Sequence, residues 1–416
     1  MRVRPWLILL AFGLAPLGAQ AEVVAREGKG YLEQRDDGQL VLHLKGSPYE
    51  MGLQHGKLLR DQVRSNMLKI AKNETELGKS DEYLAYLFMR PAMHDMLRPH
   101  IPKRFIQEMQ GLAEGAGLDY EDVEAGNLFP AAFHCSGMAL KGKATHDGSL
   151  YHVRILDYMT KLGLQDAALV IKHEPDGYRR WLNVGFAGFI GTVTGMNESQ
   201  VAIGEMGGNG MAFWDGMPMA FLMRDALERA TTMEEAVEIY AKTPRTCEYY
   251  YVISDGKTRN AVGIWATPKE FETMAYGQSY AMFEKVKPSK DPAAEGKALL
   301  KDVKVESNEY RTVFKGKGGR GFIANPPEDT IVISGPDRFL AFVERLMDGN
   351  YGKVDAPMLQ ELCKRPVSMK SNLHVAIFHP ETLEVWVAVA AKDGSPACNQ
   401  TYYRYTLEAR EGASKK

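Results

Sequence analysis

The stretch Phe133-His134-Cys135-Ser136-Gly137 stands where the texture of this 416-residue chain changes. Before it, apolar residues recur at helical spacing. After it, short apolar runs are separated by Gly, Asp and Pro, a pattern typical of strands and turns. The boundary therefore predicts a helical first part, residues 22–134, and a strand-rich second part, residues 135–416.

Two helices are expected before the boundary. The first begins at Gly46-Ser47-Pro48-Tyr49-Glu50, because this order supplies a capping serine, a first-turn proline and the glutamate of a capping box. An apolar stripe follows at helical spacing, formed by Leu59, Val63, Met67 and Ile70. The second carries Phe105, Met109 and Leu112, and its pattern breaks at Gly115-Ala116-Gly117.

Strands dominate the second part, interrupted by two helices. Strand-like runs are expected at 150–156, 167–172, 180–186, 201–206, 249–253, 261–266, 374–378 and 385–389. The helices are expected at 220–230 and after the capping box Thr232-Met233-Glu234-Glu235. Strands, then helices, then strands favour a layered α+β domain over alternating βαβ units.

The chemistry predicted from the residues centres on Cys135. A lone cysteine is more often a small buried hydrophobe than a nucleophile. However, Asp147-Gly148 predicts a tight turn, and the strand after it ends at Arg154-Ile155-Leu156-Asp157. A hairpin would bring Arg154 and Asp157 back to Cys135, where the arginine could favour the thiolate and the aspartate could orient an amine.

These residues belong to a longer pattern. It begins with Gly46-Ser47-Pro48-Tyr49-Glu50-Met51-Gly52-Leu53-Gln54-His55-Gly56 and Leu112-Ala113-Glu114-Gly115-Ala116-Gly117, and continues through Cys135-Ser136, Asp147-Gly148, Arg154-x-x-Asp157, Gly195-Met196-Asn197-Glu198, Ser307-Asn308 and Asp337-Arg338. In this order and spacing, the chain resembles the isopenicillin N acyltransferase-like family of autoproteolytic acyltransferases and hydrolases. This family is related to the choloylglycine hydrolases and acid ceramidases within the N-terminal-nucleophile superfamily.

The resemblance implies a four-layer αββα sandwich built as one composite domain. It also implies that the His134–Cys135 bond is cut, so that residues 22–134 become one fragment and Cys135 begins another. An α-amine with a pKa of about 8 could then act as the base for its own thiol. His134 departs from the small residue expected at this position in several relatives, which puts the rate of self-cleavage in doubt.

The resemblance further implies roles for the remaining site residues. Asp157 would bond the α-amine and Arg154 would stabilise the thiolate. Asn308 would donate its amide to the oxyanion, with Asn197 as the second contributor, although either asparagine could simply cap a turn. Arg338 would lie near the active site, with a surface salt bridge as its alternative.

Composition limits the partners. Residues 1–21 carry a basic start, a short apolar run and Ala19-Gln20-Ala21, which together predict a signal peptide and export to the periplasm or beyond the cell. The net charge of −2 gives no reason to expect nucleic acid or an anionic membrane as partner. No cofactor or metal is predicted, since neither a phosphate-binding loop nor metal-ligand spacing is present. A small-molecule partner is expected, and a homo-oligomer is compatible with the sequence.

The chain has four cysteines, far fewer than a disulfide scaffold. Cys363 and Cys398 resemble cysteines that recur in the related proteins, and export would place them in an oxidising compartment. They are predicted to form the single disulfide.

The function predicted from this resemblance is hydrolysis or transfer of an acyl group at an amide or small-peptide bond through a thioester on Cys135. Acyl-coenzyme A should be scarce outside the cytoplasm, which favours hydrolysis. A lipid acyl hydrolase resembling phospholipase B or ceramidase, a non-catalytic binding protein on the same scaffold, and a papain-like Cys/His enzyme remain as alternatives.

Overall fold

A computed structural model describes residues 21–72, 90–128, 134–158, 160–208, 213–277, 311–313, 322–324 and 326–408. Residues 1–20 of the predicted signal peptide and Asn308 lie outside this range. Among the described residues, no helix combines the length and apolar character needed to cross a bilayer.

The larger of two main sheets has ten strands. In spatial order they are β1 (Glu22–Glu27), β2 (Gly30–Gln34), β3 (Leu40–Gly46), β6 (Ala168–Pro175), β7 (Trp181–Phe186), β8 (Thr194–Asn197), β9 (Val201–Gly207), β10 (Tyr249–Asp255), β11 (Asn260–Ala266) and β12 (Phe271–Met274). Neighbours are antiparallel except β3 and β6, which pair in parallel from Val41↔Val170 to Gly46↔Pro175. Strands from before and after Cys135 therefore share one sheet.

The second sheet has six antiparallel strands. In order they are β15 (Thr330–Ile333), β4 (His134–Gly142), β5 (Gly148–Asp157), β16 (Asn372–His379), β17 (Glu384–Val389) and β18 (Tyr403–Thr406). A separate two-stranded sheet joins β13 (Arg311–Val313) to β14 (Phe322–Ala324).

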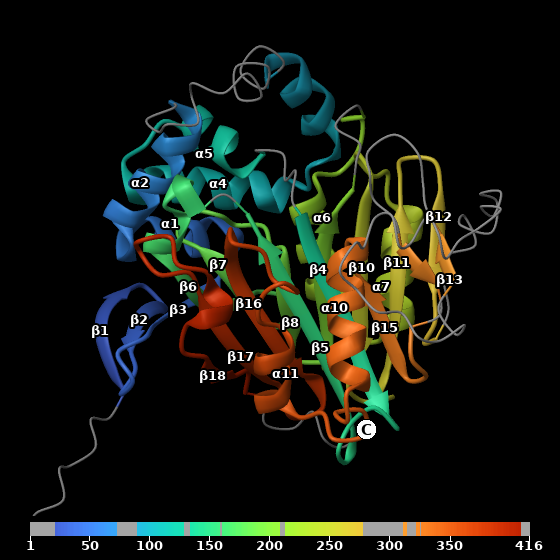
Figure 1. Ribbon diagram of the computed structural model, residues 1–416. Helices are drawn as coiled ribbons and strands as arrows, with labels where there is room; N and C mark the ends of the chain where they lie inside the picture. Colours follow the sequence, from blue (N-terminus) through green and yellow to red (C-terminus); the bar gives the residue numbers. More distant parts are fainter. Residues whose placement is uncertain are drawn as a thin grey trace, which may run out of the picture.

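The two main sheets pack face to face, with helices on both outer faces (Figure 1). The ten-stranded sheet is covered by α1 (Pro48–Leu58), α2 (Arg60–Ala71), α4 (Lys103–Ala116), α5 (Tyr120–Asn127), α6 (Met219–Arg229) and α7 (Met233–Lys242). The six-stranded sheet is covered by α10 (Pro336–Met347) and α11 (Ala356–Leu362). Between the sheets, side chains from both inner faces form two apolar clusters. The predicted α+β, four-layer αββα architecture is confirmed.

Two of the predicted helix starts are correct at residue level. Ser47 caps α1, and the reciprocal bonds of the capping box with Glu50 are both present. Thr232 caps α7 by accepting a hydrogen bond from the backbone of Glu235. At the other end of a helix, α4 stops at Gly117, whose φ of 64° is the left-handed conformation that suits glycine.

The segment 22–134 is not purely helical. Residues 22–46 contain the three strands β1, β2 and β3, which form one edge of the large sheet. The apolar side chains of β1 are partly exposed. Apolar and polar residues therefore alternate too weakly along β1 for the sequence alone to predict a strand. Cys135 also lies at the start of a strand, β4, which the strand pattern did not predict.

Helices α1 and α4 pack backbone to backbone. Their contact is built on Gly52 and Gly56 of α1 and on Gly111 and Gly115 of α4. A Cβ atom on Gly52 would overlap the carbonyl oxygen of Glu108, and one on Gly56 or Gly115 would lie 2.5 Å from a carbonyl oxygen of the opposite helix. Glycine is needed at these positions because any side chain would force the helices apart.

Candidate active site

The hairpin β4–β5 places the candidate nucleophile beside two of its predicted partners. Cys135 pairs with Leu156, and Gly137 pairs with Arg154. Directly paired residues, and residues two apart on one strand, point to the same face of a sheet. Cys135 and Arg154 therefore share the face that looks into the inter-sheet core, as the predicted hairpin requires.

Arg154 is fully buried, and its guanidinium is held by three groups. Nη1 donates to the carbonyl oxygen of Ile155 at 2.6 Å, Nη2 to Glu205 at 3.2 Å and Nε to the carbonyl of Val193 at 3.4 Å. Glu205 was not predicted as a site residue. The available signal was a carboxylate inside the otherwise apolar strand β9, since a buried carboxylate requires a partner.

Burial dominates the ionisation of the nucleophile. It raises the pKa of the Cys135 thiol to about 11, although the positive charge of Arg154 opposes the shift. The carboxylates of Glu205 and Asp157 act in the same direction as burial. In the continuous chain burial therefore favours the protonated thiol, while Arg154 acts in the predicted direction, towards the thiolate.

Asp157 and Arg338 form a second group, on the backbone side of Cys135. Arg338 donates from Nη1 to Oδ2 of Asp157 at 2.5 Å and from Nη2 to the carbonyl oxygen of Cys135 at 3.0 Å. The backbone nitrogen of Met369 donates to the other carboxylate oxygen of Asp157 at 3.0 Å. Burial raises the pKa of Asp157, and Arg338 opposes that shift. Because the side chain of Asp157 is fully buried, this ion pair is not a surface salt bridge.

Asn197 lies elsewhere. Both of its amide hydrogens are donated to carbonyl oxygens of Leu227 and Ala230, each at 2.8 Å, and its oxygen accepts from the backbone of Ser199 and Val201. The side chain thus ties β8 to the end of α6, and its amide has no hydrogen left for an oxyanion. The structure does not bring Asn197 together with Cys135, and Asn308 lies outside the described residues.

All four cysteines are free and buried, so the predicted disulfide between Cys363 and Cys398 is absent from this structure. Both thiols pack in the core between the six-stranded sheet and its helices. Within the described part of the chain, no cluster of three or more His, Cys, Asp or Glu side chains could hold a metal ion.

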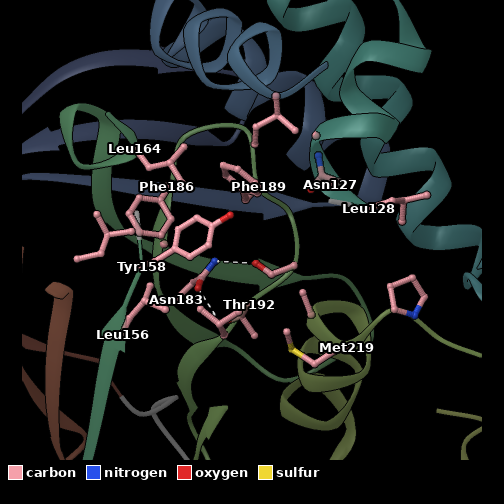
Figure 2. A pocket seen from close by; sticks show the side chains of 18 of the residues that line it. Asn127, Leu128, Leu156, Tyr158, Leu164, Asn183, Phe186, Phe189, Thr192 and Met219 are labelled. Carbon is pink, nitrogen blue, oxygen red and sulfur yellow. Dashed lines mark hydrogen bonds between the residues drawn. The ribbon is translucent and has the colours of Figure 1, made fainter. Parts of the chain in front are cut away.

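A pocket opens at the end of β5, at Leu156 and Tyr158 (Figure 2). Cys135 itself is not among the residues that line it. Two of the lining residues connect the pocket to the predicted site. Leu156 is the strand partner of Cys135, and the carbonyl of Val193 accepts a hydrogen bond from Arg154. Its other walls come from α5, the start of α6 and the segment that joins β7 to β8. Among the described residues, no charged side chain lines it, and its aromatic and aliphatic walls include Tyr158, Phe186 and Phe189.

The four-layer αββα sandwich is the fold of the N-terminal-nucleophile hydrolases. Residues 144–281 match the family model described as acyl-coenzyme A:6-aminopenicillanic acid acyl-transferase. The predicted resemblance to the isopenicillin N acyltransferase-like family is thereby confirmed.

Individual relatives agree with that match. Protein dcd1B of Dictyostelium discoideum is 30% identical over 259 residues, covering 56% of this chain and 52% of that protein. The N-acylethanolamine-hydrolyzing acid amidase of Mus musculus is 25% identical over 175 residues, covering 39% of this chain and 47% of that protein. The chain thus spans about half the length of the curated relatives it matches. A solved structure, the Caenorhabditis elegans ortholog of that amidase, covers 66% of this chain and 100% of its own, with 14% identity and a TM-score of 0.41.

Proposed function

We propose that this chain is a self-processing cysteine amidohydrolase that uses Cys135 first on its own backbone and then on an acyl-amide substrate. The observation that carries the proposal is the convergence at the start of β4. There Arg154 shares the inner face with Cys135, the Arg338–Asp157 pair holds the backbone of Cys135, and an uncharged pocket opens alongside.

In the proposed processing step, Sγ of Cys135 attacks the carbonyl carbon of His134. A carbon–sulfur bond forms, the His134–Cys135 carbon–nitrogen bond breaks, and the thiol proton ends on the departing nitrogen. Water then hydrolyses the thioester, which frees the thiol and leaves a carboxylate on His134. Arg338 supports this step by fixing the carbonyl of Cys135, so that the strand keeps its position while the bond before it breaks.

The turnover step uses the amine that processing creates. Because burial keeps the thiol protonated, a base must remove its proton as the sulfur attacks. A free α-amine on Cys135, with a pKa of about 8, supplies that base on the same residue. The acyl group is transferred to sulfur, and the protonated α-amine gives its proton to the nitrogen of the substrate's amine as that amine leaves. Water then hydrolyses the thioester, which releases the acid and restores the thiol.

The pocket supports an apolar acyl group. A charged acyl chain would lose its hydration there without gaining a charged partner among the lining residues. The mouse relative is named for the hydrolysis of N-acylethanolamines. An amide of an apolar acyl chain is therefore the substrate class that we propose. The same pocket would admit an ester lipid, so matched amide and ester substrates of one acyl chain test this alternative.

Processing and turnover can be tested together. Recombinant wild-type protein should give fragments that end at His134 and begin at Cys135 by intact-mass analysis, and should release amine from an acyl amide. Cys135→Ala should stay continuous and inactive, whereas Cys363→Ala, a buried thiol in another layer, should be processed normally. An unbroken wild-type chain that hydrolyses the substrate would overturn the self-processing mechanism, and processing without hydrolysis of any acyl compound would favour a binding protein.

Asn308 remains our proposed oxyanion donor. Loss of one such donor costs roughly a hundred- to a thousandfold in kcat with less change in KM. Asn308→Ala should therefore lower kcat to this extent while the fragments still form. Near-normal kcat in a processed Asn308→Ala protein would exclude this role.

Export is also proposed. Expression of the full chain in a bacterium with a periplasm should give a protein that begins at Glu22 in the periplasmic fraction. A cytoplasmic protein that retains residues 1–21 would contradict it.

A further inference from the structure

The segment 187–192, called here the clamped segment, connects β7 to β8 without regular secondary structure and is almost entirely buried. A buried irregular segment is unusual, because each of its backbone N–H and C=O groups must find a partner without water. Residues 22–134 supply several of these partners through side chains.

Three side chains from before Cys135 bind consecutive backbone groups. Nδ2 of Asn66 donates to the carbonyl oxygen of residue 187 at 2.9 Å, and Nε2 of His55 accepts from the nitrogen of residue 188 at 2.9 Å. Asn127 makes two bonds to this segment: it donates to the carbonyl of residue 188 at 2.9 Å and accepts from the nitrogen of residue 190 at 2.8 Å. All three side chains are buried.

Residues from after Cys135 complete the clamp. Arg224 donates to the carbonyl of residue 190 at 2.7 Å, Asn183 donates to the carbonyl of residue 191 at 3.2 Å, and the carbonyl of Ala220 accepts from the nitrogen of residue 192 at 3.1 Å. The backbone of this segment is therefore held along its length by fixed groups.

The clamped segment is also a wall of the pocket. It contributes Phe189, Gly191 and Thr192, and Asn127 itself lines the pocket from the end of α5 (Figure 2). Gly191 has no room for a side chain, because a Cβ atom there would lie 2.8 Å from the Cβ of Ala220. The position of this wall is thus set by these hydrogen bonds together with the packing of its side chains in the apolar core.

We infer that Asn127 is a positioning residue that determines which acyl chains the pocket accepts. Without its amide, the carbonyl of residue 188 and the nitrogen of residue 190 lose their partners, and each unpaired buried group disfavours the present conformation. The segment would then move to find other partners, and the adjoining pocket is the space it can enter. The part concerning acyl chains rests on the proposed function.

The test compares Asn127→Ala with Gln54→Ala. Gln54 is a matched control, because it is a buried amide of the same part of the chain that bonds a backbone segment in both directions, at Lys45, and does not line the pocket. Hydrogen exchange of residues 187–192 should be about tenfold faster in Asn127→Ala and unchanged in Gln54→Ala. The ratio of kcat/KM for a long-chain and a short-chain acyl anilide should also change about tenfold in Asn127→Ala alone.

Two failures are distinguishable. Unchanged exchange in Asn127→Ala overturns the inference whatever the activity, and changed exchange with an unchanged chain-length ratio overturns the assignment of specificity while the proposed function stands. If the wild-type protein hydrolyses no anilide, the proposed function fails, and exchange alone decides the positioning role. Should Asn127→Ala not fold, Asn127→Ser keeps a smaller polar group there, and the same readings apply to it.

Discussion

Arg154 and Arg224 are both fully buried and both face carboxylates, yet they are bound differently. Arg224, in the helix layer, contacts both carboxylate oxygens of Glu108 at 2.8 and 2.6 Å and one of Glu228 at 2.7 Å. Arg154, between the sheets, has one carboxylate contact, at 3.2 Å to Glu205. An arginine whose charge is fully paired with carboxylates holds the layers of the fold together. An arginine with one longer carboxylate contact beside a thiol keeps positive charge available to that thiol.

The largest effect is expected from Arg224→Met. It would leave Glu108 and Glu228 buried without their main partner, which costs roughly 3–5 kcal/mol of unfolding free energy. Urea unfolding measures this. Arg345 is the control, because it bonds only carbonyl oxygens and its replacement strands no carboxylate. Equal destabilisation by Arg224→Met and Arg345→Met would contradict the distinction.

The second prediction concerns Arg154 and Glu205 as a pair. Arg154→Met alone should destabilise the protein, because Glu205 stays buried. Arg154→Met with Glu205→Gln should recover most of that stability but remain about a hundred- to a thousandfold slower in kcat, since the charge near the reacting sulfur is gone. Unfolding curves and steady-state hydrolysis separate the two effects. Recovery of activity together with stability would mean that Arg154 is structural, like Arg224.

A smaller loss of unfolding free energy is expected from a substitution in the uncharged contact between two helices. Gly52→Ala inserts a methyl group into the backbone contact between α1 and α4 and should cost roughly 1–3 kcal/mol of unfolding free energy. Lys57→Ala, on the exposed side of α1, loses one surface ion pair with Glu27 and should cost less than about 1 kcal/mol. A neutral Gly52→Ala would show that the helices can separate freely.

The last prediction concerns pH and is measured one histidine at a time. Burial lowers the pKa of His55 and His152 to about 3, and those of His173 and His374 well below the ordinary value. Between about pH 6.5 and 3 the unfolded chain binds more protons at these sites, so unfolding free energy falls as pH falls, by about 1.4 kcal/mol per pH unit per histidine.

The histidines on the helix side and those between the sheets can be compared by their contributions to this pH dependence. His55 and His173 lie on the helix side, and His152 lies between the sheets. Urea unfolding at pH 7 and pH 5 should show a loss that is smaller in a His55→Gln protein. The raised pKa of Asp157 acts in the opposite sense at lower pH, because the folded state then takes up its proton first. Equal stability at both pH values would disprove neutral burial of the histidines.

Sequence patterns predicted the parts of the fold that depend on local signals. The capping residues Ser47 and Thr232 fixed two helix starts, and the turn at Asp147-Gly148 fixed the hairpin that carries Arg154. The strands β1, β2 and β3 were missed for two reasons. The pairing of β3 with β6 joins residues more than a hundred positions apart, and β1, which pairs locally with β2, is too exposed to show a clear apolar pattern.

Some residues of the candidate site were predicted from the sequence and others were not, for a similar reason. Arg154 and Asp157 are close to Cys135 through one hairpin, so their spacing is informative. Glu205 meets Arg154 only through the stacking of two sheets, which no local pattern encodes. Asn197 was misassigned because a sequence motif shows that an amide side chain is present but not which way it points. Here the amide points to the end of α6.

The parallel pairing of β3 with β6 affects how the protein can recover from damage. Under the proposed scission, the two polypeptides are held in one sheet, and unfolding releases them as separate molecules. Refolding then becomes a bimolecular event that slows on dilution, and the larger fragment alone exposes the unpaired edge of β6, which invites aggregation. The continuous Cys135→Ala chain refolds as one molecule at any concentration. A mature enzyme of this design would be folded once, before it is cut, and then replaced rather than repaired.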